Sequence, residues 1–194
     1  MLQKIVLASG NKGKLKELRE MLSPAGLEVF PQSDFAVSDA PEPYFTFVEN
    51  ALNKARHASR ETGLPALADD SGICADSLGG APGVMSARYA GEHGADQLNN
   101  RKLVADLMPF EDKSANFYCV LVYVRHPGDP QPVIADGLWQ GKIVPEPQGE
   151  NGFGYDPHFW VPELGKTAAQ LSPEEKNRLS HRGKALRALL EKLK

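Results

Sequence analysis

The sequence contains little cysteine and no long apolar run, and each shortage argues against a class of protein. Only two of its 194 residues are cysteines, Cys74 and Cys119, and they form no C-x-x-C motif. Both lie in apolar, strand-like surroundings, which favours buried, reduced thiols over a disulfide framework. No apolar run approaches the ~20 residues that a membrane-spanning helix needs, so we expect no membrane association.

A net positive charge is also lacking. The formal net charge is -3 at pH 7, which argues against a protein that lives on nucleic acid. The five histidines include no pair at the i,i+4 spacing of a helical zinc site. Magnesium stays open, because it needs only one or two carboxylates together with phosphate oxygens. The chain opens directly on a strand-like run without the pattern of a signal peptide, so we expect a cytoplasmic protein.

The composition is that of an ordinary globular protein, with 41% hydrophobic and 24% charged residues. The length suits one domain or one domain with two lobes, and we treat residues 1–194 as a single domain. Alternating strand and helix patterns predict a mixed α/β fold with a central sheet and flanking helices. Strands are predicted at 5–8, 27–30, 66–68, 73–75, 117–125, 132–144 and 158–161, and helices at 15–22, 46–62, 95–108, from 172 onward and at 185–190.

Two of these predictions concern local detail. The run Asp69-Asp70-Ser71-Gly72 is typical of a polar turn at a strand end. The helix at 95–108 offers apolar residues for the core at helical spacing. These candidate core positions are Leu98, Leu103, Val104 and Leu107.

The segment Ser9-Gly10-Asn11-Lys12-Gly13-Lys14 follows an apolar strand pattern and precedes a helical one. A glycine-bearing turn at a helix start favours anion binding, because backbone N–H groups there lack intrahelical partners and the helix dipole is positive. The spacing matches neither the P-loop nor G-x-G-x-x-G. From these residues alone, an anion site and a plain connection with a solvated basic helix stay equally open.

Acidic and basic residues in the middle of the chain are candidates for catalysis. Adjacent carboxylates on a strand point to opposite sides, so one of Asp69 and Asp70 faces a cleft, and we choose Asp70. Glu42 lies between two prolines in an irregular loop, and Lys54 lies on the same helical face as Asn50. Each also has an ordinary structural interpretation: a turn aspartate, an exposed loop acid and a solvated helix face.

Two motifs near the C-terminus are candidates for nucleotide binding. Ser180-His181-Arg182-Gly183 begins a helix, where an arginine opposes the helix dipole and so suggests a role beyond capping. Phe153 lies between two glycines and offers a ring face for stacking a base, although such a ring also packs into cores.

Six motifs occur in one order along essentially the whole chain: Ser9–Lys14; Thr46–Ala51 with Lys54–Ala55; Ala68–Gly72; Gly80–Gly83 with Ser86–Tyr89; Gly152–Pro157; and Ser180–Gly183. Together they resemble the inosine triphosphate pyrophosphatase family, in its bacterial dITP/XTP pyrophosphatase branch. Ser9 stands where threonine is frequent in that family and keeps the hydroxyl.

The resemblance implies hydrolysis of ITP, dITP or XTP to the monophosphate and pyrophosphate, with Mg²⁺, by a homodimer that clears deaminated purines. It also implies a long twisted sheet and two lobes around a nucleotide cleft. It assigns Glu42 and Asp70 to the metal and Asp70 to accepting a proton from water. The triphosphate positions are Ser9, Gly10, Asn11, Lys12, Gly13, Lys14 and Lys54, and the other nucleotide positions are Ser71, Phe153, Gly154, Tyr155, Asp156, Lys176, His181 and Arg182.

Hydrogen-bond polarity predicts the choice of base. Hypoxanthine and xanthine present a carbonyl acceptor at the purine 6-position, whereas adenine presents a donor that faces the donors of His181 and Arg182. Unpaired buried donors cost ~1–3 kcal/mol each, which is enough to reject ATP. Two alternatives stay open: a Maf-like house-cleaning pyrophosphatase for other modified nucleotides, and a non-catalytic nucleotide-binding module.

Overall fold

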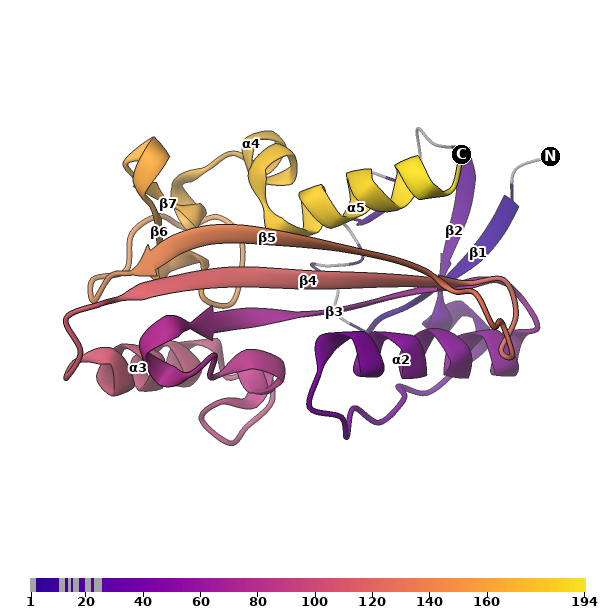
Figure 1. Ribbon diagram of the computed structural model, residues 1–194, viewed down its shortest axis with the longest axis horizontal. Helices are drawn as coiled ribbons and strands as arrows, with labels where there is room; N and C mark the ends of the chain where they lie inside the picture. Colours follow the sequence, from indigo (N-terminus) through magenta and orange to yellow (C-terminus); the bar gives the residue numbers. More distant parts are fainter. Residues whose placement is uncertain (1–2, 11–12, 14, 16–17, 20–21, 23–25) are drawn as a thin grey trace. The chain divides into compact units, whose positions relative to one another are not determined.

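A seven-stranded sheet in the order β2-β1-β3-β4-β5-β6-β7 organises the chain (Figure 1). The computed structural model describes residues 3–10, 13, 15, 18–19, 22 and 26–194. The chain divides into two compact units, and the strands β3, β4 and β5 continue from one unit into the other. Unit 1 comprises 1–70, 119–137 and 182–194, and unit 2 comprises 71–118 and 138–181. The predicted mixed α/β class is confirmed.

The strands of unit 1 pair in parallel around β1 (Gln3–Ala8). On one side β1 pairs with β2 (Leu27–Pro31), and on the other with the first half of β3 (Ala66–Ala75). A strand buried on both faces reads as a continuous apolar run, and residues 5–8 of β1 are buried accordingly.

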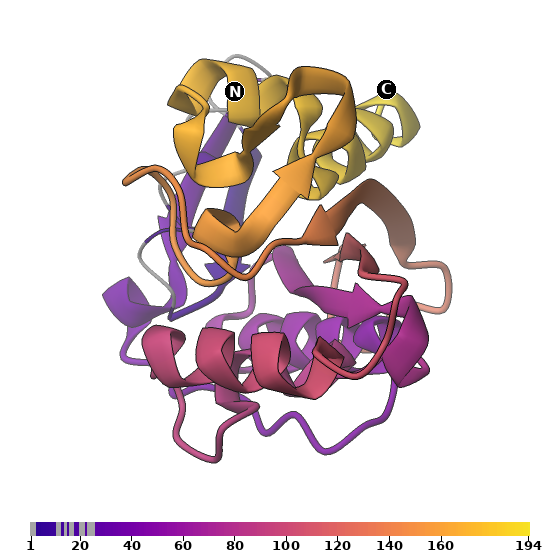
Figure 2. The ribbon, with the colours of Figure 1, turned by 90° about the vertical axis from the view of Figure 1, so that its left-hand side faces the viewer.

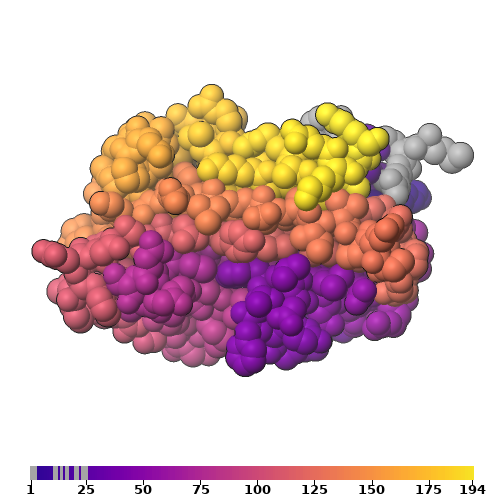
Figure 3. Space-filling view, viewed as in Figure 1, coloured from indigo at the N-terminus to yellow at the C-terminus, as the bar shows by residue number. Residues whose placement is uncertain are grey.

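Helices cover both faces of the unit 1 sheet. The helix α2 (Phe47–Thr62) lies along one face and α5 (His181–Lys192) along the other (Figure 1). Figure 3 shows the yellow outer surface of α5. Residues of α5 join the strands in one apolar cluster, which buries Ala185, Leu186 and Leu189 completely. Unit 1 therefore has a core of its own.

Unit 2 is built on the remaining halves of β4 (Ser114–Val124) and β5 (Val133–Ile143). Its helices α3 and α4 lie on opposite sides of these strands (Figure 2). In the core of unit 2, the ring centroid of Phe159 lies 4.5 Å from that of Phe117 and 5.2 Å from that of Trp139. The other elements of unit 2 are α3 (Asp96–Leu107), β6 (Phe159–Val161), β7 (Lys166–Thr167) and α4 (Pro173–Leu179). Short 3-10 helices are η2 (Gln32–Phe35) in unit 1, and η3 (Asp76–Leu78), η4 (Gly83–Arg88), η5 (Asp156–His158), η6 (Pro162–Leu164) and η7 (Ala168–Gln170) in unit 2.

Helix boundaries follow the capping signals of the sequence. Thr46 caps α2 by accepting from the backbone N–H of Glu49, and Gly63 ends the helix at φ +70°. Ser172 and Glu175 form the predicted capping box of α4. In the segment predicted as helix at 15–22, the described residues 15, 18, 19 and 22 are helical. Among the described residues, no helix combines the length and apolar character needed to span a membrane.

Three local predictions were wrong. Residues 69–72 form no turn, because β3 runs unbroken from Ala66 to Ala75. Leu98 is 48% exposed, and the next two residues, Asn99 and Asn100, are buried in its place because their amides bond loop backbone. Cys119 is buried as predicted, whereas Cys74 is only partly buried; both are free thiols.

Candidate functional site

The predicted site residues form two groups, one in each unit. The first half of the chain supplies most of the group in unit 1, and α5 adds Arg182. The group in unit 2 consists of Ser71, Phe153, Gly154, Tyr155, Asp156, Lys176 and His181. Of the predicted triphosphate segment, Ser9, Gly10 and Gly13 are described, whereas Asn11, Lys12 and Lys14 lie outside the described residues.

The glycine-bearing segment leaves β1 at its carboxyl end, where the N–H of Ser9 donates to the carbonyl of Leu7 at 3.0 Å. A Cβ added at Gly10 would lie 3.0 Å from the Asp39 carboxylate, so the glycine permits a close approach there. Gln32 donates to the same carboxylate. No motif in the sequence indicates that Asp39 lies beside this segment.

Lys54 joins the two predicted metal ligands. Its ammonium lies 2.6 Å from Glu42 Oε1 and 3.9 Å from Asp70 Oδ1. Burial alone lowers the pKa of Lys54, but nearby carboxylates outweigh burial and raise this pKa above its ordinary value. Those carboxylates belong to Asp69, Asp70 and Glu42. Lys54 is therefore a charged ammonium at neutral pH, beside the two acids that the resemblance assigns to the metal.

The two adjacent aspartates of β3 serve opposite faces of the sheet. Asp70 approaches Lys54 of α2, whereas Asp69 Oδ2 lies 3.8 Å from Arg182 Nε of α5. Asp69 is fully buried, and Arg182 is 2% exposed. Successive strand side chains alternate in direction, and this alternation explains why each acid reaches a cation on a different helix. The alternation was visible in the sequence, but the partner of Asp69 was not.

The carboxylates of Glu42 and Asp70 fit a hard divalent cation. Both are oxygen donors that face one position, now held by the Lys54 ammonium. Magnesium commonly takes one or two carboxylates and completes its shell with water and phosphate oxygens. Within the ranges that the structure describes, no cluster of three or more His, Cys, Asp or Glu side chains has the geometry of a metal site.

In unit 2, the loop that carries Phe153 is fixed by its own acid. Asp156 Oδ2 accepts from the N–H of Phe153 at 2.8 Å and lies 2.7 Å from Lys176 Nζ. Gly152 has φ +78°, and a Cβ there would overlap the Asp156 carboxylate. Asn100 donates to the carbonyl of Gly154 at 2.8 Å. The loop is thus held from both sides.

Aromatic rings in this group have defined neighbours. The Lys176 ammonium lies 4.8 Å from the ring centroid of Phe153, a cation–π contact. The His181 ring stacks on Phe117 at 4.7 Å between centroids. The hydroxyl of Tyr155 donates to the carbonyl of Ser86 at 2.8 Å, and burial raises the pKa of Tyr155. Tyr155 is thus a structural member of the group, with its hydroxyl directed at backbone.

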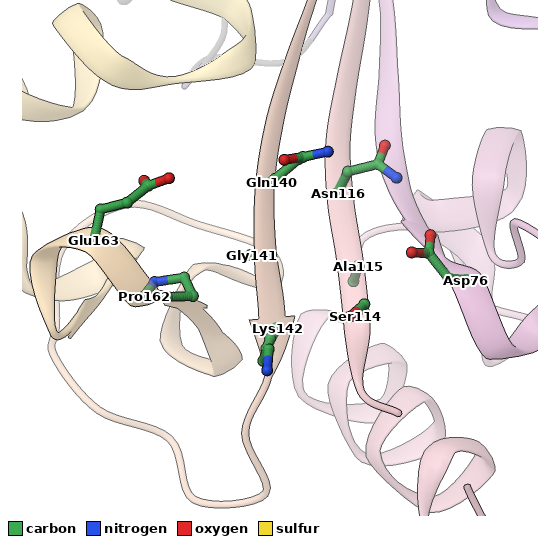
Figure 4. Close-up of a pocket in the computed structure, with 9 residues that line it drawn as sticks. All are labelled: Asp76, Ser114, Ala115, Asn116, Gln140, Gly141, Lys142, Pro162 and Glu163. Atoms are coloured by element: carbon green, nitrogen blue, oxygen red, sulfur yellow. The ribbon is translucent and has the colours of Figure 1, made fainter. Parts of the chain in front are cut away.

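A hollow of about 280 Å³ lies beside the parts of β4 and β5 that belong to unit 2 (Figure 4). No predicted site residue lines it. Its lining residues are Asp76, Ser114, Ala115, Asn116, Gln140, Gly141, Lys142, Pro162 and Glu163.

Comparison with known proteins covers almost the entire chain. A model of the Ham1 family matches residues 5–192. A dITP/XTP pyrophosphatase of Nitrosomonas europaea is 62% identical over 192 residues, which span 99% of this chain and 95% of that protein. A dITP/XTP pyrophosphatase of Neisseria meningitidis serogroup A is 60% identical over 192 residues, which span 98% of this chain and 96% of that protein.

Solved structures agree. A HAM1 protein from Coxiella burnetii has a TM-score of 0.93 and 49% identity and covers 98% of both chains. The Staphylococcus aureus Ham1 protein has a TM-score of 0.88 and 39% identity, with the same coverage.

Proposed function

Because the chain belongs to the Ham1 family, we propose that it hydrolyses the non-standard purine nucleoside triphosphates ITP, dITP and XTP to the monophosphate and pyrophosphate. The observation that carries the proposal is that relatives named dITP/XTP pyrophosphatases are 60% and 62% identical to this chain over nearly its full length. The resemblance of the six motifs supports the same reaction. In the cell, this reaction would remove deaminated purines from the nucleotide pool.

The cluster in unit 1 suits attack on a triphosphate. Water attacks the α-phosphorus, the anhydride bond between the α- and β-phosphates breaks, and pyrophosphate leaves with the bonding electrons. Asp70 accepts the proton of the attacking water. The Lys54 ammonium, charged because carboxylates raise its pKa, stabilises the negative charge that grows on the leaving pyrophosphate. The segment Ser9–Lys14 holds the remaining phosphate oxygens.

We propose that Mg²⁺ is required and that Glu42 and Asp70 hold it. When bound, the ion neutralises phosphate charge and lowers the cost of forming pyrophosphate. Lys54, which contacts Glu42, would bind a phosphate oxygen of the substrate. The arrangement of two carboxylates around one cation supports this assignment.

The residues at the chain's C-terminal end are assigned to the base and sugar. Phe153 presents a ring for stacking, and its loop is held by Asp156, which also binds Lys176. His181 and Arg182 donate to the 6-carbonyl of hypoxanthine or xanthine. The Asp69 carboxylate, 3.8 Å from Arg182, helps to fix the direction of that guanidinium. The nucleotide roles of Ser71, Gly154 and Tyr155 follow from the resemblance.

We also propose that the protein works as a homodimer in the cytoplasm. The family resemblance supports the dimer, and the nature of the substrate supports the compartment. Light scattering coupled to size-exclusion chromatography tests the dimer, which predicts a mass near twice the 21.1 kDa of the chain.

A substrate panel tests the proposed reaction. Pyrophosphate release is measured for ITP, dITP, XTP, GTP and ATP, with Mg²⁺ and with excess chelator. We expect rapid release from the first three substrates with Mg²⁺ and little without it, and rejection of ATP by one to several orders of magnitude. Equal rates for ITP and ATP would remove the proposed base selectivity.

A further inference from the structure

One face of α2 is bonded to the irregular segment 38–44, which carries Glu42. Four polar side chains at positions 50, 53, 54 and 57 share this face, because i, i+3, i+4 and i+7 lie together on a helix. Asn53 Nδ2 donates to the carbonyl of Pro41 at 2.8 Å, and His57 Nε2 lies 3.0 Å from the carbonyl of Ser38. Lys54 binds the Glu42 carboxylate itself.

Asn50 makes the most complete of these contacts. Its Oδ1 accepts from the N–H of Tyr44 at 3.1 Å, and its Nδ2 donates to the carbonyl of the same residue at 3.2 Å. Asn50 is 1% exposed, so its amide is committed to the backbone of this one residue. Glu42 is flanked by Pro41 and Pro43, which have no N–H, and Tyr44 is therefore the first residue after Glu42 whose backbone can both donate and accept.

Within this segment the buried apolar side chain is that of Ala40, which is 9% exposed. Tyr44 is 42% exposed and the following Phe45 is 95% exposed, so neither ring anchors the backbone to the core. The backbone at Glu42 lies in neither a helix nor a strand. The hydrogen bonds from α2 therefore contribute to its position, and among the α2 side chains that make them Asn50 is the most buried.

We propose that Asn50 is a positioning residue that holds the Glu42 carboxylate at the Lys54–Asp70 cluster by clamping the backbone of Tyr44. The inference rests on the proposed function, because it matters for turnover only if Glu42 takes part in the reaction. Outer groups that orient metal-binding carboxylates typically change metal affinity or activity by 10–100-fold when removed.

Asn99 provides a matched control. It is also 1% exposed, and its amide likewise bonds backbone N–H and C=O groups of a loop, at Ala90 (2.7 Å) and Ala87 (3.2 Å). It lies in unit 2, and its loop carries none of the predicted site residues. Asn50→Ala and Asn99→Ala therefore remove the same kind of contact, and only the first removes it beside Glu42.

The first readout needs no activity. Amide hydrogen exchange at Tyr44 is compared in the wild type, Asn50→Ala and Asn99→Ala. We expect exchange at Tyr44 to accelerate at least tenfold in Asn50→Ala and to stay unchanged in Asn99→Ala. Unchanged exchange in Asn50→Ala would overturn the proposed clamp. If Asn50→Ala does not fold, Asn50→Ser keeps a hydroxyl at the buried position but is too short for both contacts, and it takes its place.

The second readout is a double-mutant cycle on ITP hydrolysis. We expect Asn50→Ala to lower kcat/KM about 10–100-fold and to raise the half-maximal Mg²⁺ concentration about tenfold. In a Glu42→Ala background, Asn50→Ala should lower the residual rate less than about threefold, whereas Asn99→Ala should have the same effect in both backgrounds. Equal losses from Asn50→Ala with and without Glu42 would overturn the inference, since Asn50 would then act independently of Glu42. A near-normal rate for Glu42→Ala alone would instead remove Glu42 from the proposed function, even with fast exchange at Tyr44.

Discussion

Asp69 and Asp70 are neighbours on β3 but contact cations on different helices. Asp70 faces Lys54, and Asp69 faces Arg182. From the alternation of strand side chains, the sequence predicted that only one of the pair faces a cleft. The contact between Asp69 and Arg182 could not be predicted, because it joins residues more than a hundred positions apart. The Asn50 clamp was hidden for a similar reason, since nothing in the sequence shows which loop a helix face contacts.

Asp70 is expected to be essential for turnover. Asp70→Asn keeps the shape but removes the proton acceptor, so we predict a loss of 10²–10⁴-fold or more in kcat with nucleotide binding still measurable. Stopped-flow or steady-state kinetics with ITP, together with calorimetric binding, checks this. A variant that retains near-normal kcat would exclude Asp70 as the base.

Arg182 is expected to set the choice of base. Arg182→Ala removes a donor to the 6-carbonyl, so we predict that the ratio of kcat/KM for ITP over ATP falls about tenfold or more. Competition between the two substrates in one reaction measures the ratio directly. The account of base choice is wrong if the variant keeps the wild-type ratio.

Lys54 is expected to make the unfolding free energy depend on pH in the alkaline range. The pKa of Lys54 is higher in the folded state than in the unfolded state, where it is about 10.4. The stabilisation by its ammonium is therefore fully present below about pH 10.4 and is lost as the pH rises through the folded-state pKa. The difference in unfolding free energy between the wild type and Lys54→Met should therefore shrink above about pH 10.4. Lys102→Met is the control, because its 2.8 Å ion pair is exposed and contributes little. A difference that is constant from pH 8 to 12 would contradict the prediction.

At the scale of elements, most helices and strands followed local signals. Capping residues predicted the start of α2 and α4, an apolar run predicted β1, and strand-like runs predicted β4 and β5. The failure at 69–72 has a physical cause: aspartate and glycine favour turns locally, but long-range ion pairs stabilise them within a strand. The prediction that Leu98 lies in the core failed for a similar reason, because hydrogen bonds to loop backbone favour burial of the two asparagines that follow it.

The loop around Phe153 yields a prediction about glycine. Both Gly152 and Gly154 have left-handed backbone, at φ +78° and +63°, but only at Gly152 would a Cβ meet the Asp156 carboxylate. Gly154→Ala should cost about 1 kcal/mol of unfolding free energy from backbone strain, and Gly152→Ala should cost at least about 2 kcal/mol more, because it also disrupts the buried pair of Asp156 and Lys176. Urea unfolding of the two variants measures both values. Equal losses would show that the pair adapts freely.

For the whole molecule, the important feature is that neither unit is a continuous piece of chain. Unit 1 is completed by residues 182–194, which no local pattern in the sequence assigns to it. Its core includes three fully buried residues of α5, which stabilise unit 1 by about 5 kcal/mol on ordinary burial values. The amphipathic pattern of α5 was predictable, but its membership of unit 1 required the fold.

Deletion of residues 181–194 is therefore expected to unfold unit 1. That loss is similar to the whole stability of a typical domain, about 5–15 kcal/mol. Thermal unfolding followed by circular dichroism should show a transition at least 15 °C lower or none, whereas a chain ending at Leu193 keeps all of α5 and its core contacts and should unfold as the wild type does. A native-like transition in the shorter chain would contradict this division into units.

The most direct test of the proposed reaction is the identity of its phosphate products. Purified protein is incubated with ITP and Mg²⁺, and the products are followed by ³¹P nuclear magnetic resonance. We predict IMP and pyrophosphate in equal amounts, with no IDP at any time. Formation of IDP and inorganic phosphate, or no hydrolysis of ITP, would contradict cleavage between the α- and β-phosphates.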